Sequence, residues 1–127
     1  MAVIITSGGL AFMQDYLAAN ERSLAQQVPS YIVLGSGLTP PSYFMTTVPG
    51  ETFRTAIVGR DKSGAGVTYH GFLNTSDNAN QTVAVYGVVA GQASAAANTV
   101  TLIAIVAEPS PFSKDATKVL NVDLIVT

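Results

Sequence analysis

His70 is the only imidazole in this 127-residue chain, which contains no cysteine and no tryptophan. A metal site needs several converging ligands, and no second His, no Cys and no carboxylate stands at a recognisable ligand spacing from His70. On an alternating strand, His70 shares a face with Thr68 and Phe72. This pattern favours a sheet histidine with a hydrogen-bond partner, and we predict neither a metal nor a cofactor.

Ser36, His70 and a carboxylate are the groups from which a nucleophilic triad could be built. The Gly-Ser-Gly around Ser36 is not the Gly-x-Ser-x-Gly elbow that exposes a serine between a strand and a helix. It also lacks the Gly-Lys-Ser/Thr ending and the following helix of a phosphate-binding loop. The eight acids stand mostly beside predicted turns or strand ends, where solvated carboxylates are expected. We therefore predict that the chain is not an enzyme and has no catalytic residue.

Charged residues are scarce in this sequence. They make up 11% of the chain, against about 25% in typical soluble proteins, while hydrophobic residues make up 48%. Six basic residues are dispersed among eight acids, so no cationic stripe is available for successive phosphates. No apolar run approaches the roughly 18 residues of a membrane helix. The composition therefore argues against nucleic acid and membrane insertion and favours association with other proteins, with a neutral monomer as the alternative.

One helix is predicted near the start of the chain, over residues 8–20. Its apolar residues recur at intervals of three and four from Leu10 to Leu17, the spacing of one helix face. Thr6 or Ser7 can cap its first turn. The elements that follow read as strands.

Segments rich in β-branched and aromatic residues predict strands over 30–35, 52–60, 67–75, 82–90, 99–107 and 118–126. The second and third are expected to form a hairpin that turns over 61–66. The fourth and fifth are apolar on both faces, which predicts central strands joined by a loop over 91–98. Pro109 and Pro111 are expected to break the chain before the final strand, whose alternation predicts one buried face.

The segment from Leu38 to Gly50 holds three prolines and predicts a loop, because proline lacks an N–H and restricts the residue before it. We predict a protein contact surface here, since aromatic residues and methionine are typical interface anchors. The candidate contact residues are Leu38, Pro40, Pro41, Tyr43, Phe44, Met45 and Arg54. The alternative is a loop that folds over its own core. Arg54 could pair with Glu51 or with a neighbouring chain, or reach water from an edge strand.

Several motifs follow one another in a recognisable order: "IITSGGLAFMQDYLAAN", "YIVLGSGLTPPS", "VPGETFRTAIVG", a strand pair, and "PFSKDATKVLNVDLIV". This succession resembles the N-terminal domain of bacteriophage tail fibre and tail-collar proteins over nearly the whole chain. The matching positions are Ile5, Thr6, Gly9, Gly35, Gly37, Arg54, Lys114, Thr117, Leu120 and Val122. The family's E-x-G motif is replaced here by Val85, Tyr86 and Gly87, so no role of that Glu carries over. Family members usually continue into a shaft and a receptor-binding tip, whereas this sequence stops at Thr127, which suggests an attachment domain alone.

The resemblance implies a virion structural protein of a phage-like tail, an oligomeric adaptor or a baseplate or tail-fibre component that assembles by non-covalent docking. Its partners would be other copies of itself, most simply as a trimer, and other tail or baseplate proteins. It would be made in the host cytoplasm and reside in the virion tail. One alternative is a capsid-side or neck structural protein. Another is a carbohydrate-binding module in which Tyr43, Phe44, Tyr69 and Tyr86 stack on sugar rings.

Together, the predicted elements and the resemblance indicate one α+β domain over residues 1–127. Its expected architecture is one N-terminal helix packed on a mostly antiparallel β-sheet or sandwich.

Overall fold

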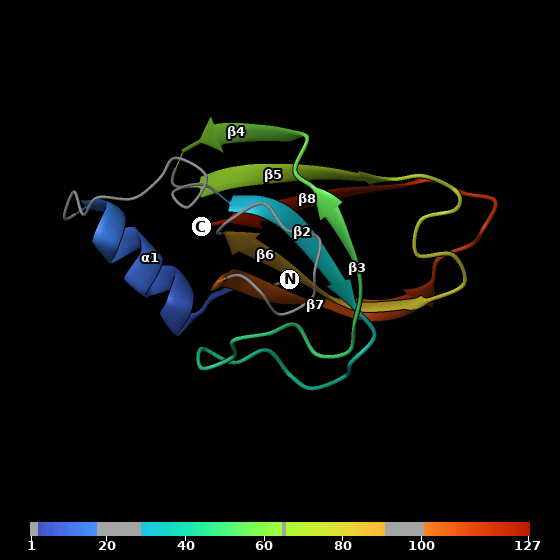
Figure 1. The fold of residues 1–127 in the computed structure, drawn as a ribbon, viewed down its shortest axis with the longest axis horizontal. Coiled ribbons are helices and arrows are strands. Elements are labelled where there is room, and N and C mark those ends of the chain that lie inside the picture. The colour runs from blue at the N-terminus through green and yellow to red at the C-terminus, as the bar shows by residue number, and fades with distance from the viewer. Residues whose placement is uncertain (1–2, 18–28, 65, 91–100) are drawn as a thin grey trace.

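The structure, a computed structural model, describes residues 3–17, 29–64, 66–90 and 101–127. Its elements in chain order are β1 (Ile4–Ile5), α1 (Ser7–Leu17), β2 (Pro29–Gly35), β3 (Glu51–Ala56), β4 (Gly59–Ser63), β5 (Gly66–Leu73), β6 (Thr82–Ala90), β7 (Thr101–Ser113) and β8 (Leu120–Val126). All strand pairs are antiparallel and form two sheets, one of order β1-β7-β6-β2-β3 and one of order β4-β5-β8 (Figure 1). The prediction of a mostly antiparallel β structure with one short helix is confirmed.

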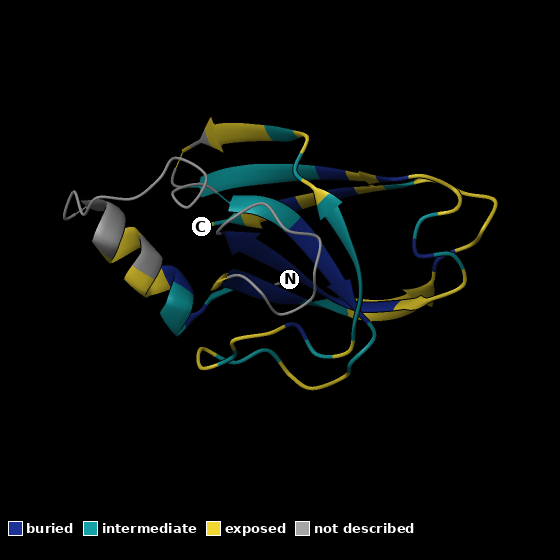
Figure 2. Ribbon diagram, in the orientation of Figure 1, coloured by how far each residue is buried: buried dark blue, intermediate teal, exposed yellow. Residues whose placement is uncertain are grey.

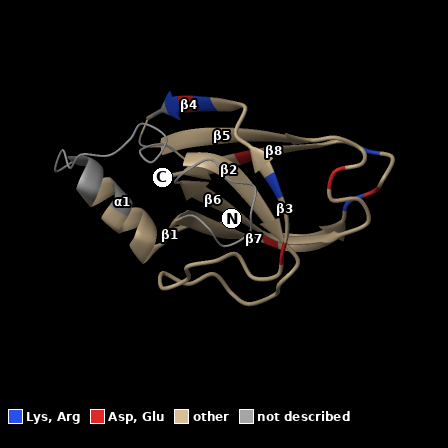
Figure 3. Ribbon diagram, viewed as in Figure 1, with Lys and Arg blue, Asp and Glu red and all other residues tan. Residues whose placement is uncertain are grey.

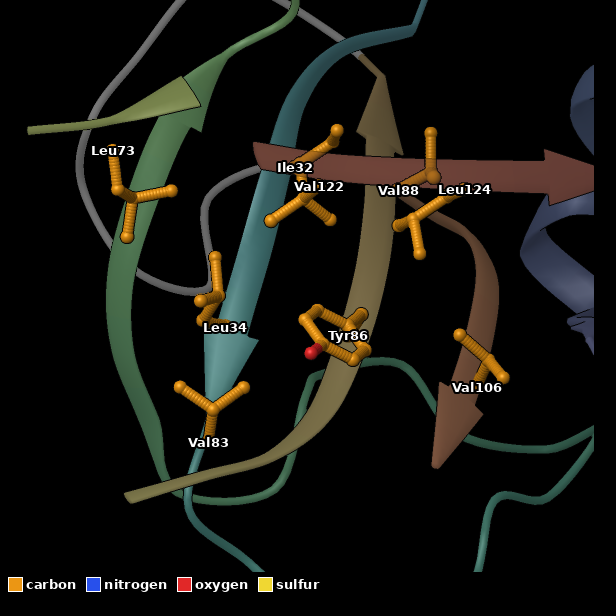
Figure 4. Packing of buried hydrophobic residues seen from close by; sticks show 9 residues of the cluster. All are labelled: Ile32, Leu34, Leu73, Val83, Tyr86, Val88, Val106, Val122 and Leu124. Atoms are coloured by element: carbon orange, nitrogen blue, oxygen red, sulfur yellow. The ribbon is translucent and has the colours of Figure 1, made fainter. Parts of the chain in front are cut away.

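The two sheets share one apolar core (Figure 4). Ile32 and Leu34 of β2 and Val88 of β6 form one cluster with Val122 and Leu124 of β8, and each of these side chains is at most 5% exposed. Full burial of such a side chain stabilises the fold by about 1.5–3 kcal/mol. The contact between the sheets is therefore a principal source of stability.

The other face of the five-stranded sheet is covered by residues 36–50, which we call the contact loop. Val48 of this loop is buried in a second cluster that includes Val33 and Val85. A Cβ atom on Gly87 would lie 2.5 Å from Cγ2 of Val48, so the loop rests directly on β6. Cover on both faces accounts for strands that are apolar throughout. The prediction that 82–90 and 99–107 hold central strands is confirmed by β6 and β7.

The predicted hairpin is wrong in its first strand, because the chain changes sheets in the middle of segment 52–60. β3 pairs with β2, whereas β4 pairs with β5. The switch occurs between neighbouring residues: Ile57 N donates to Ser30 O (3.0 Å), and Val58 N donates to His70 O (2.8 Å). The predicted turn is correspondingly displaced, since Asp61 lies within β4. Both strands alternate with the same period, so the pattern alone could not reveal the change of sheet.

Pro109 and Pro111 do not end β7, contrary to the prediction. The β6–β7 register passes from Val85↔Ala107 to Val83↔Phe112, so residues 108–111 bulge from the ladder. Within such a bulge, the N–H that proline lacks is not needed for strand pairing. The strand therefore continues to Ser113.

Helix α1 begins at Ser7, one residue before the predicted start, and Thr6, one of the two predicted caps, forms its cap. The Thr6 hydroxyl accepts a hydrogen bond from Gly9 N (3.1 Å), which satisfies one of the free donors of the first turn. Thr6 N donates to Ile103 O (3.0 Å) and ties this turn to β7. The rest of the predicted helix, residues 18–20, lies outside the described residues, as does the predicted loop over 91–98. The final strand is confirmed by β8, with its alternating burial.

Lys114 is 3% exposed, although lysine side chains are almost never buried without partners. Its Nζ donates to the carbonyl oxygens of Asn74 (2.9 Å) and Thr75 (3.2 Å). Its backbone also bonds Gln81 and Asn80. Lys114 therefore fastens the loop over 74–81, which lies at the end of the molecule away from α1 (Figure 1).

We expect Lys114→Met to lower the free energy of unfolding by about 1–3 kcal/mol, because it removes the part-buried hydrogen bonds from Nζ to the carbonyl oxygens of Asn74 and Thr75. Denaturant titration of both proteins measures the difference. Lys118→Met is the matched control, since Lys118 is exposed and its replacement should change stability by less than about 0.5 kcal/mol. Equal effects of the two substitutions would contradict this role of Lys114.

Candidate functional site

The contact loop is tied to its own chain at its base and near its tip. At the base, Ser36 N donates to Gly50 O (3.0 Å) and Gly37 N donates to Pro49 O (3.1 Å). Near the tip, Ser7 N at the start of α1 donates to Tyr43 O (2.7 Å). The loop backbone is therefore held at both places by hydrogen bonds within the chain itself.

Glycine is required where the two arms of the contact loop meet. A Cβ atom on Gly37 would lie 2.5 Å from Cβ of Pro49, closer than real Cβ contacts. Gly50 has a φ of +60°, in the left-handed region that favours glycine. These positions let the arms approach closely enough to hydrogen-bond, which fixes the direction in which the loop leaves the sheet.

The side chains of the contact loop divide into an inward and an outward set. Met45 packs on the cluster that contains Val48. Leu38 and Phe44 are 77% and 78% exposed, and Tyr43, 41% exposed, meets Phe44 edge-to-face with ring centroids 5.1 Å apart. Exposed residues predominate along this loop in Figure 2. The alternative of a loop that folds over its own core therefore holds for Met45 and Val48, whereas Leu38, Tyr43 and Phe44 are exposed.

The two predicted proline contacts differ as well, since Pro40 is exposed and Pro41 is half-buried. Both lie between Leu38 and Tyr43. The exposed members of the predicted contact set are thus Leu38, Pro40, Tyr43 and Phe44.

Arg54 is not part of the exposed set. Its side chain is only 4% exposed, and that of Glu51 is 10% exposed. Arg54 Nε lies 2.7 Å from Glu51 Oε2, and Nη2 lies 3.1 Å from Oε1, a bidentate ion pair. The predicted pairing of Arg54 with Glu51 is confirmed. The alternative prediction, an Arg54 side chain that reaches water from an edge strand, is wrong. The acidic residues are predicted to be solvated, and Glu51, whose side chain is nearly buried, is an exception.

A bulge explains why residues 51 and 54 meet. On a regular strand, residues three apart point to opposite faces. The β2–β3 register passes from Leu34↔Phe53 to Gly35↔Glu51, which leaves Thr52 without a Cα partner. The extra residue turns Glu51 to the face that Arg54 occupies.

His70 lies between two carboxylates on the outer face of the three-stranded sheet. Its Nδ1 is 2.6 Å from Asp123 Oδ1, and its Nε2 is 2.7 Å from Asp61 Oδ2. Asp123 is the direct cross-strand partner of His70 on β8, while Asp61 reaches diagonally from β4, where it faces Thr68. The prediction of a hydrogen-bonded sheet histidine is confirmed. The hydrogen bond to Asp123, followed by that to Asp61, raises the pKa of His70.

This arrangement uses both ring nitrogens of His70 for strand contacts. A ring flanked in this way has no nitrogen directed at Ser36, which lies on the loop that covers the other sheet. Across the described ranges, no group of three or more His, Cys, Asp or Glu is arranged to hold a metal ion. The chemistry that the geometry supports at His70 is a proton-dependent clamp across three strands.

Sequence reasoning missed Asp61 and Asp123 as partners of His70. Asp61 is nine residues from His70 and Asp123 is 53 residues away. Only the strand register brings the three together. The period-two pattern of β8 placed Asp123 on the outer face but gave no indication of which strand lies beside it.

Tyr86, one of the four aromatics of the carbohydrate-binding alternative, lies in the core between the sheets and is 6% exposed. Its hydroxyl donates to Glu108 Oε2 (2.9 Å), and burial raises its pKa. A side chain in this position cannot stack on a sugar ring. Tyr69 is half-buried, and Tyr43 and Phe44 are the exposed members of that set.

Comparison with protein family models, with curated proteins and with solved structures finds no match for this chain. No helix in the part of the chain that the structure describes has the length and apolarity needed to cross a membrane.

We expect the wild-type protein to lose stability as the pH rises from 6 to 9. The folded pKa of His70 lies above its ordinary value of 6.5, so the stabilisation is complete below 6.5 and is lost as the pH rises through the folded value. Denaturant unfolding at each pH measures this slope. His70→Gln, which removes the only imidazole, should flatten it, and an unchanged slope in that variant would contradict the clamp.

We expect Arg54→Met to lower the free energy of unfolding by about 3–5 kcal/mol, because it leaves the Glu51 carboxylate buried without its counter-ion. The double variant Glu51→Leu/Arg54→Met should recover most of that loss, since it removes both charges. Thermal and denaturant unfolding of the three proteins measure the difference. A double variant less stable than Arg54→Met would show that the pair contributes more than mutual neutralisation.

Proposed function

We propose that this chain is a structural subunit of a phage-like virion tail that assembles by non-covalent docking through its contact loop. Its partners are other copies of itself, most simply as a trimer, and other tail or baseplate proteins. The observation that carries the proposal is the outward presentation of Leu38 and Phe44 by a loop whose backbone is already tied at base and tip.

The energetics of this loop favour docking. Covering a large apolar side chain that is now exposed contributes about 1.5–3 kcal/mol, and the loop offers two such side chains with Tyr43 beside them. Binding also costs the ordering of flexible groups. Because the backbone is held by bonds to Gly50, Pro49 and Ser7, most of that cost is met when the chain folds.

The charge distribution supports the same conclusion. Residues 36–50 contain no Lys, Arg, Asp or Glu. Figure 3 shows charged positions on β3, β4, β7 and β8 and in the loops at the end away from α1, whereas most of the ribbon carries neither Lys, Arg, Asp nor Glu. Interface centres are depleted of charged residues and enriched in aromatic residues and methionine. A loop with this composition suits a docking surface.

We also propose that α1 packs on the five-stranded sheet and completes an α+β attachment domain. The support for this packing is the close approach of its first turn to β7. A Cβ atom on Gly9 would lie 2.1 Å from Ile103 O, so only glycine fits at that contact. This approach places the start of α1 beside both β7 and the contact loop.

A capsid-side or neck protein would use the same assembly physics, and location distinguishes it from a tail protein. Tails are purified from lysates of the producing cells, their heads are removed, and the remaining particles are probed for the chain. Recovery with the tails supports the proposal. Recovery only with heads or necks would overturn the assignment to the tail. It would not affect the proposal that the chain docks through its contact loop.

We expect Leu38→Ser/Phe44→Ser to reduce incorporation into these particles at least about tenfold, because two apolar anchors are lost from the contact loop. Each variant is expressed in producing cells that lack the wild-type protein, and quantitative mass spectrometry of the purified particles measures how much of the variant is incorporated. Val58→Ser is the matched control, since Val58 is 70% exposed and lies outside the contact loop. Equal incorporation of the three proteins would show that the loop is not the docking surface.

A further inference from the structure

In the described part of the chain, β8 lies at one edge of the three-stranded sheet, and this edge is built differently from the other one. Among the described residues, β8 pairs with β5 alone, so alternate backbone N–H and C=O groups face away from the sheet. At the opposite edge, β4 carries Arg60, Asp61 and Lys62, and charges of this kind protect sheet edges from pairing. β8 spans seven residues with no proline, no lysine and no register shift against β5. It is therefore the edge best suited to receive another strand.

The outward side chains along this edge form a symmetric series. Val119, just before β8, is 52% exposed, and Ile125 is 56% exposed. Between them lie the exposed residues Asn121 and Asp123. Asp123 uses Oδ1 to contact His70, and its second oxygen makes no hydrogen bond to the described residues. The outward series therefore has an apolar side chain at each end, with an amide and a carboxylate between them.

We propose that β8 pairs antiparallel with β8 of a second copy, about a two-fold axis at Val122. In this register Val119 lies opposite Ile125 of the second copy, and Asn121 lies opposite Asp123 of the second copy. Two exposed apolar side chains cover each other, and an amide N–H₂ faces a carboxylate. The core-facing series also matches, since Leu120 lies opposite Leu124 of the second copy.

Other registers of the same pairing are less favourable. A shift of two residues places Asp123 opposite Asp123 of the second copy, and like charges directly opposite are destabilising. The shift in the other direction places Asp123 opposite the apolar Val119 of the second copy. A shift of one residue sets core-facing side chains against outward ones. The register centred on Val122 avoids all three conflicts.

The β4 edge of a second copy is a poorer partner for β8. Arg60 lies opposite Tyr69, a residue that packs on the core between the sheets, so Arg60 and Lys62 belong to the core side of β4. Pairing with β8 would set these cations beside Val122 and Leu124. The self-complementary series of β8 therefore selects a second copy of the same strand.

This inference rests on the proposed function, which states that copies of the chain associate. It adds the surface through which two copies join. The surface is distinct from the contact loop, because β8 belongs to the three-stranded sheet and the loop covers the five-stranded one. A two-fold contact requires an even number of copies. A trimer formed through the contact loops would pair with a second trimer.

Disulfide trapping tests the pairing and its register, because the chain has no native cysteine. Val119→Cys and Ile125→Cys each alter an exposed side chain. In the proposed register the two positions are direct partners, whose Cα atoms lie about 4.5–5.5 Å apart in antiparallel sheets, within disulfide range. Like positions lie about six residues apart along the strand, or about 20 Å, which is too far. Under mild oxidation, a mixture of the two proteins should give the mixed disulfide dimer, whereas each alone should give none.

Exchange of the amide and the carboxylate between positions 121 and 123 provides a second, independent test of the pairing. Asn121→Asp places carboxylates opposite each other and should weaken self-association by about tenfold. The double variant Asn121→Asp/Asp123→Asn restores the amide–carboxylate pair and should recover it. Ser110→Asp, an exposed position on β7, is the matched control and should leave association unchanged.

No mixed disulfide, or dimers from Val119→Cys alone, would overturn the inference. Adding Leu38→Ser/Phe44→Ser to both cysteine variants separates the two proposals. The mixed disulfide should persist in that background, because trapping reads only β8. If trapping fails while the loop variant still reduces incorporation into tails, the β8 pairing is wrong and the proposed function stands.

Discussion

Burial of the five-stranded sheet on both faces is the constraint on which the rest of this structure depends. On one face, β2 and β6 meet β5 and β8 in a single apolar cluster. On the other, the contact loop presses Val48 and Met45 onto the same strands. The chain provides this second cover between β2 and β3. It leaves β2 through a turn at Gly35 and Gly37, crosses the face of the sheet, and returns to β3. The loop therefore covers the sheet, and its side chains Leu38 and Phe44 are exposed.

The function that we propose follows from how the apolar side chains are divided. The strands use most of them internally, but Leu38, Phe44, Val119 and Ile125 remain substantially exposed. Few charged residues surround them, since only 11% of the chain is charged. The charges present are partly engaged within the fold: Arg54 with Glu51, Lys114 with backbone carbonyls, and His70 with two aspartates. What remains outside is a weakly charged surface with apolar anchors on a fixed backbone.

Local patterns predicted the elements whose identity depends on their own sequence. The cap at Thr6, the two central strands and the alternation of β8 are of this kind. Features that depend on distant segments were not predictable: the change of sheet between Ile57 and Val58, the bulge that holds Pro109 in β7, and the meeting of Asp61 with His70. The same limit applies to the contact loop. Its prolines indicated a loop, but which side chains point outward depends on where the five-stranded sheet lies beneath it.

The central claim is that this exterior is built to be covered by other protein chains. The mass of the purified wild-type protein across a dilution series, measured by sedimentation equilibrium, tests it most directly. The account predicts assemblies of more than one chain that dissociate on dilution. A mass equal to one chain at every concentration, up to the solubility limit, would contradict it.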